Sequence, residues 1–148
     1  MPPRKRRIPV VLDTNIIVGY YLSRNPRSAN AEIIRLWRDE RKLQLIVSAE
    51  VEEEYLEILA RLGVPEGLVN RFAARLRRRE TVTRVGLGTR STASRDPDDN
   101  VMIAAALSGR AKFLITNDHD LLDIPELERR KFRFEIVTPA EFLAQVEE

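Results

Sequence analysis

Short runs of β-branched and aliphatic residues alternate along this chain with longer segments whose apolar residues recur at helical spacing. The expected strands cover residues 8–12, 43–47, 81–85, 112–115 and 134–137. The expected helices cover residues 16–22, 33–37, 48–62, 66–79 and 97–107, with a last helix that begins at Pro139. Strands that alternate with helices favour a mostly parallel sheet covered on both faces. The sequence therefore predicts a three-layer α/β/α domain.

The length and composition indicate one soluble domain. A chain of 148 residues is long enough for one core, so we expect a single domain over residues 1–148 that starts with a flexible basic segment, residues 1–7. No apolar run approaches the ~20 residues that cross a bilayer, and Asp13 interrupts any signal-peptide core, so a cytoplasmic protein with no membrane contact is expected. Cysteine is absent, which excludes disulfides, thiolate catalysis and cysteine-based metal sites.

The formal net charge of +2 hides an uneven distribution of charged residues. Basic blocks lie at residues 4–7 and 75–79, while acidic residues gather elsewhere. Such blocks are able to contact phosphate groups, although a run of arginines on a helix is more often a solvated face. Composition alone leaves both interpretations open.

Acidic residues follow two of the expected strands where each strand ends. Asp13 directly follows the first strand, and Asp118 lies just beyond the fourth. The carboxyl ends of parallel strands share one edge of the sheet, which is where ligands bind in open α/β sheets. The group Asp96, Asp98 and Asp99 opens a later helix and reaches the same edge if a strand leads into it. Each acid taken singly also suits a helix cap or a turn, so the joint placement carries the argument.

The helix expected over residues 48–62 carries several glutamates that compete for a further position at this edge. They are Glu50, Glu52, Glu53, Glu54 and Glu57. At about 100° per residue the apolar stripe centres near Val51 and Tyr55, which puts Glu53 and Glu57 opposite it. Glu52 and Glu54 lie on the borders of the stripe, and periodicity does not choose between them.

Several carboxylates in one cleft repel each other unless a positive charge lies between them. Mg²⁺ or Mn²⁺ suits oxygen ligands, and such an ion is able to activate water and to neutralise charge on a phosphodiester. The chemistry that this cluster favours is phosphodiester hydrolysis. His119 stands beside Asp118, but a lone histidine on a loop is more often a surface residue, so it stays outside the expected site.

Four segments in order resemble the PIN-domain nucleases, in particular the bacterial and archaeal toxins similar to VapC, over nearly the whole chain. The segments are Val10-Val11-Leu12-Asp13-Thr14-Asn15, Ser48-Ala49-Glu50-Val51 running to Glu54, Asp96-Pro97-Asp98-Asp99-Asn100, and Ile115-Thr116-Asn117-Asp118-His119-Asp120-Leu121-Leu122. The resemblance implies a three-layer α/β fold, a Mg²⁺ or Mn²⁺ site and hydrolysis of RNA. It also implies that dimers are common and that toxin members are neutralised by a cognate antitoxin protein.

Carried over by position, the resemblance implies an acidic quartet that holds the metal. The quartet consists of Asp13, Glu54, Asp99 and Asp118. The resemblance thereby favours Glu54 over Glu52. It also implies two auxiliary acids, Asp96 and Asp120, and two polar residues that orient the acids, Asn15 and Thr116.

One position departs from the family pattern, in which many members carry an acid three residues before an Ile-Ala-Ala run. Asn100 holds that spacing here, ahead of Ile103, so either Asp96 or Asp99 is the third metal ligand. Basic residues of the 75–79 block and of the Gly- and Ser-rich loop after the third strand are expected to hold the RNA backbone. They are Arg75, Arg78, Arg90 and Arg95.

The expected function is therefore a metal-dependent endoribonuclease that acts as the toxin of a type II toxin-antitoxin system and forms a homodimer. A non-catalytic module that binds RNA or an antitoxin is an alternative from another class. A phosphatase with an aspartate nucleophile is a further alternative, because Asp13 follows the first strand. Asn15 stands where such an enzyme needs its second aspartate, which ranks this alternative last.

Overall fold

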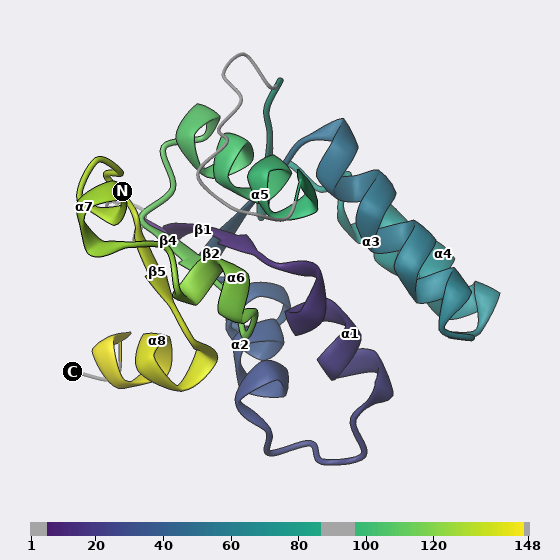
Figure 1. The fold of residues 1–148 in the computed structure, drawn as a ribbon. Helices are drawn as coiled ribbons and strands as arrows, with labels where there is room; N and C mark the ends of the chain where they lie inside the picture. Colours follow the sequence, from purple (N-terminus) through teal and green to yellow (C-terminus); the bar gives the residue numbers. More distant parts are fainter. Residues whose placement is uncertain (1–5, 87–96, 147–148) are drawn as a thin grey trace, which may run out of the picture.

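The computed structural model describes residues 6–86 and 97–146 and is built around a five-stranded sheet (Figure 1). The strands are β1 (Ile8–Leu12), β2 (Leu43–Val47), β3 (Val82–Arg84), β4 (Phe113–Ile115) and β5 (Glu135–Val137). Their order is β3-β2-β1-β4-β5, and every pair of neighbours is parallel. The strands therefore all begin at one edge of the sheet, the amino edge, and end at the opposite one, the carboxyl edge.

The helices connect the strands and cover both faces of the sheet. They are α1 (Thr14–Leu22), α2 (Ala29–Arg38), α3 (Ala49–Arg61), α4 (Glu66–Arg75), α5 (Pro97–Ser108), α6 (His119–Leu122), α7 (Glu126–Arg129) and α8 (Pro139–Val146). In Figure 1, α2 and α8 lie together on one face and α5 lies on the other. This arrangement confirms the predicted three-layer α/β/α fold. Within residues 6–86 and 97–146, no helix is long and apolar enough to span a membrane.

The centre of the sheet and α5 form the core of the domain. Val10, Val11 and Leu12 of β1 are completely buried, as expected for a parallel strand that is covered on both faces. Residues 102–106 of α5 are all buried, in agreement with their apolar character around the whole helix. Burying one such large aliphatic side chain contributes about 1.5–3 kcal/mol. The core therefore holds the carboxyl ends of the strands in fixed positions.

The helix expected over residues 66–79 is shorter in the structure, because α4 ends at Arg75. Leu76 follows with a completely buried side chain, and its amide donates to the carbonyl oxygen of Phe72 at 3.0 Å. The chain then turns, and the Arg78 carbonyl accepts a hydrogen bond from the amide of Val82 at the start of β3. The short helices α6 and α7 were not predicted, since four residues are too few to show helical periodicity.

Helix α5 ends at Ser108, and Gly109 and Arg110 form the turn that follows it. The residue in the left-handed conformation is Arg110, with a φ of 54°, and the Ala111 amide donates to the Ala106 carbonyl across it at 2.9 Å. Gly109 is required for a different reason, because a Cβ atom there would lie 2.4 Å from Cγ2 of Ile46 on β2. Close packing of α5 on the sheet, and not backbone conformation, therefore explains Gly109.

Two substitutions at this turn are expected to change stability in opposite directions. Gly109→Ala should lower the free energy of unfolding by about 1–3 kcal/mol, because its methyl group collides with Ile46. Arg110→Gly should raise it by up to about 1 kcal/mol, because glycine adopts a positive φ without a steric penalty. Urea unfolding of both variants measures the difference. An Arg110→Gly variant less stable than the wild type would show that the arginine side chain stabilises the fold by contacts.

Candidate active site

Asp13 lies at the carboxyl end of β1, where it begins α1, and only 5% of it is exposed. One carboxylate oxygen, Oδ1, accepts from the amide of Thr14 at 2.8 Å, so the predicted helix cap is present. The other oxygen, Oδ2, accepts from Oγ1 of Thr116 at 2.6 Å and from Nδ2 of Asn15 at 3.1 Å. These donors fix the orientation of the carboxylate. Thr116 and Asn15, the two polar residues that the resemblance singled out, therefore both contact the Asp13 carboxylate.

Asp118 is joined to Asp13 through Thr116, which follows β4 and is completely buried. The Thr116 hydroxyl donates to Asp13 and accepts from the amide of Asp118 at 2.9 Å. Oδ1 of Asp118 accepts from the amide of Asp120 at 2.9 Å, so Asp118 caps α6. Asp118 thus caps α6, and its backbone is held by the same hydroxyl that donates to Asp13. The auxiliary acid Asp120 is half-buried in the first turn of α6.

The structure distinguishes the two glutamates that periodicity left open. The hydroxyl of Thr14 donates to the carboxylate of Glu54, which brings Glu54 to the start of α1 and next to Asp13. Glu52 is buried and forms an ion pair with Arg84 of β3, and a longer one with Arg77. Glu54 is therefore the glutamate that joins the acids at the carboxyl edge, while Glu52 is held by cations on the other border of α3.

The Tyr55 hydroxyl lies within the electrostatic influence of both Asp13 and Glu54. Its side chain is completely buried, and its hydroxyl donates to the carbonyl oxygen of Leu12 at the end of β1. Burial raises the pKa of this hydroxyl well above its usual value, and the negative charges of Asp13 and Glu54 raise it further. Sequence periodicity identified Tyr55 only as a core residue. Its hydrogen bond to β1 links α3 to the strand that carries Asp13.

Glu54 opens onto a surface cavity of about 340 Å³ between α3 and α5. The lining side chains come from Glu50, Glu53, Glu54, Glu57, Ile58, Arg61 and Val101. Four of them are glutamates, so the wall that α3 contributes is strongly negative. Val101 places the first turns of α5 on the opposite side of this cavity. The first turns of α5 therefore lie close to the wall that carries Glu54.

The predictions for the third acid lie outside the part of the chain that can be described. Asp96 precedes α5, and the side chain of Asp99 falls in its first turn, where only the backbone is described. Arg90 and Arg95 also lie outside the described residues. Asn100, which holds the family spacing, is half-buried on α5. The choice between Asp96 and Asp99 therefore stays a prediction.

The described side chains alone do not complete a metal site. Within residues 6–86 and 97–146, no group of three His, Asp or Glu side chains is placed to hold a cation. The donors at the carboxyl edge are nevertheless all carboxylates, supported by hydroxyl and amide groups. Such hard oxygen ligands match Mg²⁺ or Mn²⁺ and not softer metals. The chemistry of the donor set therefore agrees with the expected ion, provided that an acid near the start of α5 joins it.

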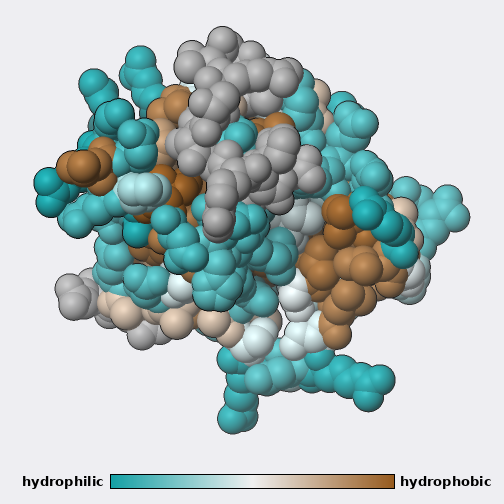
Figure 2. Space-filling view, viewed as in Figure 1, coloured by the Kyte–Doolittle hydropathy of each residue, from teal (hydrophilic) through white to brown (hydrophobic). Residues whose placement is uncertain are grey.

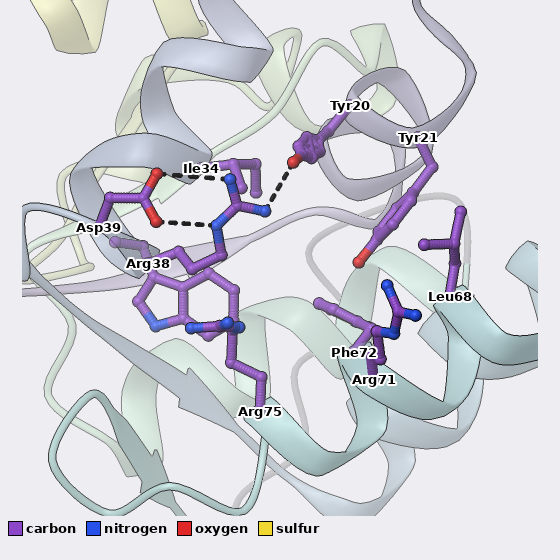
Figure 3. Close-up of a pocket in the computed structure, with 10 residues that line it drawn as sticks. Tyr20, Tyr21, Ile34, Arg38, Asp39, Leu68, Arg71, Phe72 and Arg75 are labelled. Carbon is purple, nitrogen blue, oxygen red and sulfur yellow. Dashed lines mark hydrogen bonds and ion pairs between the residues drawn. The ribbon is translucent and has the colours of Figure 1, made fainter.

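Arg75 and Arg78, which were expected to hold RNA, do not line the cavity beside Glu54. Arg75 lines a separate cavity of about 290 Å³ between α1, α2 and α4, shown in Figure 3. There Arg38 donates to Tyr20 at 2.6 Å and to Asp39 at 3.0 Å. Burial and the nearby charges of Arg78 and Arg38 lower the pKa of Arg75. Arg78 is exposed in the turn before β3.

Fold and site together define a three-layer α/β domain whose carboxylates gather at the carboxyl edge of a parallel sheet. The family model described as a PIN domain matches residues 9–120, a range that includes Asp13, Glu54 and Asp118. The chain belongs to the PIN-domain family, whose members are nucleases.

A solved structure shares this fold. It is the crystal structure of VapBC2 from Rickettsia felis bound to a DNA fragment from their promoter. The match has a TM-score of 0.57 and 14% sequence identity, and it covers 88% of this chain and 98% of the matched chain. No curated protein sequence matches the chain.

Proposed function

We propose that this protein is an endoribonuclease that depends on Mg²⁺ or Mn²⁺. The observation that carries the proposal is the convergence of carboxylates at the carboxyl edge of a PIN domain. Thr116 contacts Asp13 and the backbone of Asp118, and Thr14 binds Glu54. Hydrogen bonds over such distances in the sequence bring together acids that would otherwise repel each other. A cluster of this kind costs stability, which a domain tolerates where it gains function.

The residues that would hold the cation are Asp13, Glu54 and Asp118, together with Asp96 or Asp99. When bound, a divalent cation supplies positive charge for the phosphodiester and lowers the pKa of water. The protein's own contribution is to fix the carboxylates, and Asn15 and Thr116 do this for Asp13. Asp120 lies in the first turn of α6 beside Asp118 and is an auxiliary acid in this proposal.

Hydrolysis by water forms no covalent intermediate with the protein, which separates this proposal from an aspartate-nucleophile phosphatase. Such a phosphatase needs a second carboxylic acid close to the nucleophile to protonate the leaving group. Asn15 occupies that position, and its amide donates to Asp13. An amide cannot act as a general acid, so the observed contact supports a holding role for Asn15.

The direct test is incubation of the purified protein with a panel of single-stranded and structured RNAs. Cleavage is expected with Mg²⁺ or Mn²⁺, should stop in EDTA, and should return when the metal is added back. Binding without cleavage across the panel would instead support the non-catalytic module. Trapping of a phosphorylated aspartate would support the phosphatase.

A toxin role with a protein antitoxin is the further part of this proposal. The structural match to VapBC2 supports it, because that structure holds a toxin-antitoxin complex. Exposed leucines on the surface suit a protein partner. Leu68 lines the cavity shown in Figure 3 and is 38% exposed, and Leu22 at the end of α1 is 49% exposed. Hydrophobic residues also form a patch beside α1 (Figure 2). A homodimer and a cytoplasmic location complete the proposal, and co-expression with a neighbouring small reading frame tests the partner.

A further inference from the structure

Exposed cations stand at the amino edge of the sheet, opposite the acids. They lie in the segments that lead into four of the five strands: Arg41 before β2, Arg78 and Arg79 before β3, Arg110 and Lys112 before β4, and Arg133 before β5. We call these six residues the basic edge. Because all strands are parallel, every one of these segments is brought to the same side of the molecule. Glu40, Glu80 and Glu135 lie in or directly beside the same segments, but the cations outnumber them, so the amino edge is positive overall.

The basic edge is not neutralised by the protein itself. Within the described part of the chain, none of its six side chains makes an ion pair or a side-chain hydrogen bond. Neighbouring cations behave differently, since Lys42 pairs with Glu40 and Lys131 pairs with Glu128. Exposed cations without a carboxylate partner repel each other, and a bound anion would relieve that repulsion.

A cavity at the basic edge is a candidate binding site for an anion. It has a volume of about 510 Å³ and lies between the end of α5 and the starts of β4 and β5. Arg110, Lys112, Lys131 and Arg133 line it above a floor that includes Phe134, and no acidic residue contributes to the lining. Hydrophilic residues protrude around α7 and the end of α5 in Figure 2. The cavity is therefore positive on several sides.

The backbone at Arg110 gives an independent reason to connect this cavity with a ligand. Arg110 occupies a left-handed position that favours glycine, and Arg41 does the same with a φ of 54°. An arginine at such a position is less favourable than a glycine, because its Cβ crowds the backbone. Residues that break a local rule are expected where function requires them. At both turns the chain keeps a cation at the amino edge despite this cost.

We propose that the basic edge binds the phosphate backbone of a folded RNA whose cleavage takes place at the acids of the opposite edge. The inference rests on the proposed ribonuclease function. The six cations lie on both sides of β1, in a sheet whose neighbouring strands are about 4.8 Å apart. A row of this width suits several phosphates better than one small anion. The five-residue β1 separates the two edges by about 16 Å. Only an RNA that extends around the domain contacts the basic edge and the acids at the same time. The protein should therefore prefer a folded RNA to a very short one.

The experiment measures RNA binding without cleavage, in a protein that carries Asp13→Asn. The test variant adds Arg110→Asn, Lys112→Gln and Arg133→Gln, in which asparagine tolerates the left-handed backbone. The matched control adds Arg24→Gln, Arg27→Gln and Arg35→Gln. These three residues are exposed, belong neither to the basic edge nor to the cavity beside Glu54, and change the net charge equally. Fluorescence anisotropy reports the affinity for an RNA hairpin and for an RNA tetranucleotide at several salt concentrations.

The test variant should bind the hairpin about 10- to 100-fold more weakly, with a salt dependence reduced by about two to three phosphate contacts. The control variant should keep most of its affinity, and the tetranucleotide should be affected much less. Equal losses in both variants, or tighter binding of polyglutamate than of the hairpin, would overturn the inference. The variant Arg110→Gly tests whether weaker binding is caused by unfolding. It should stabilise the fold and still weaken hairpin binding, which unfolding cannot explain.

The same measurements separate this inference from the proposed function. If the wild type cuts no RNA but hairpin binding depends on the basic edge, the proposed ribonuclease activity fails and the binding surface stands. If the wild type cuts RNA and the test variant binds the hairpin normally, the binding surface fails and the ribonuclease stands.

Discussion

Asp13→Asn is expected to reduce RNA cleavage by at least about 100-fold in the presence of Mg²⁺ or Mn²⁺. The substitution removes one negative charge at the point where Thr14, Asn15 and Thr116 converge on a single carboxylate. An amide in place of Oδ2 also faces two groups that donate hydrogen bonds there. The variant therefore loses both the charge and the ordered geometry that a cation would need. Initial rates with a fluorescent RNA measure this effect.

The fold should survive the same substitution, which makes the loss of activity interpretable. Asparagine is as good a helix cap as aspartate, so α1 keeps its start. The mispaired amide should cost about 1 kcal/mol, partly offset by lower repulsion from Glu54. Millimolar Mn²⁺ should raise the Tm of the wild type and not that of Asp13→Asn, since binding to the native state alone is stabilising. A variant that cleaves RNA at the wild-type rate would contradict the proposed mechanism.

Glu54→Gln and Glu52→Gln form a matched pair on one helix with opposite expected results. Glu54→Gln should lower cleavage by about 100-fold with little change in Tm, because Glu54 belongs to the acidic cluster beside Asp13. Glu52→Gln should lower the free energy of unfolding by about 1–2 kcal/mol, because it breaks the ion pair with Arg84. Its activity should stay close to that of the wild type once the protein is folded.

Activity assays and thermal unfolding of the two variants are read together. Loss of activity in Glu52→Gln at a temperature where it is folded would place Glu52 at the active site and refute the assignment. Loss of folding in Glu54→Gln would show that the bond from Thr14 is mainly structural. A Tm that increases in Glu54→Gln would support electrostatic repulsion within the acidic cluster.

The opposite charges of the two sheet edges follow from a simple property of parallel sheets. Every strand begins on one side and ends on the other, so residues that precede strands never meet residues that follow them. Asp13 and Asp118 come after β1 and β4, while Arg110 and Lys112 come before β4. A difference of a few positions in the sequence therefore moves a charged side chain to the other side of the domain.

The sequence by itself determined the alternation of strands and helices, and with it the parallel sheet. It also determined that Asp13 and Asp118 follow strands, since a charged residue ends a buried apolar run. Local patterns were sufficient here because each depends on neighbours along the chain. They were insufficient at the end of α5, where Gly109 packs closely against Ile46 and an arginine, Arg110, takes the left-handed position.

Only the tertiary structure decided the partners of the glutamates on α3. Periodicity treated Glu52 and Glu54 alike, because both border the same apolar stripe. Thr14 binds one and Arg84 binds the other, and these two residues come from different strand ends. The position of Asp13 was thus set by its place after β1. The residues that lie near Asp13 at the carboxyl edge were set by hydrogen bonds between segments far apart in the chain. No local sequence pattern contains such contacts.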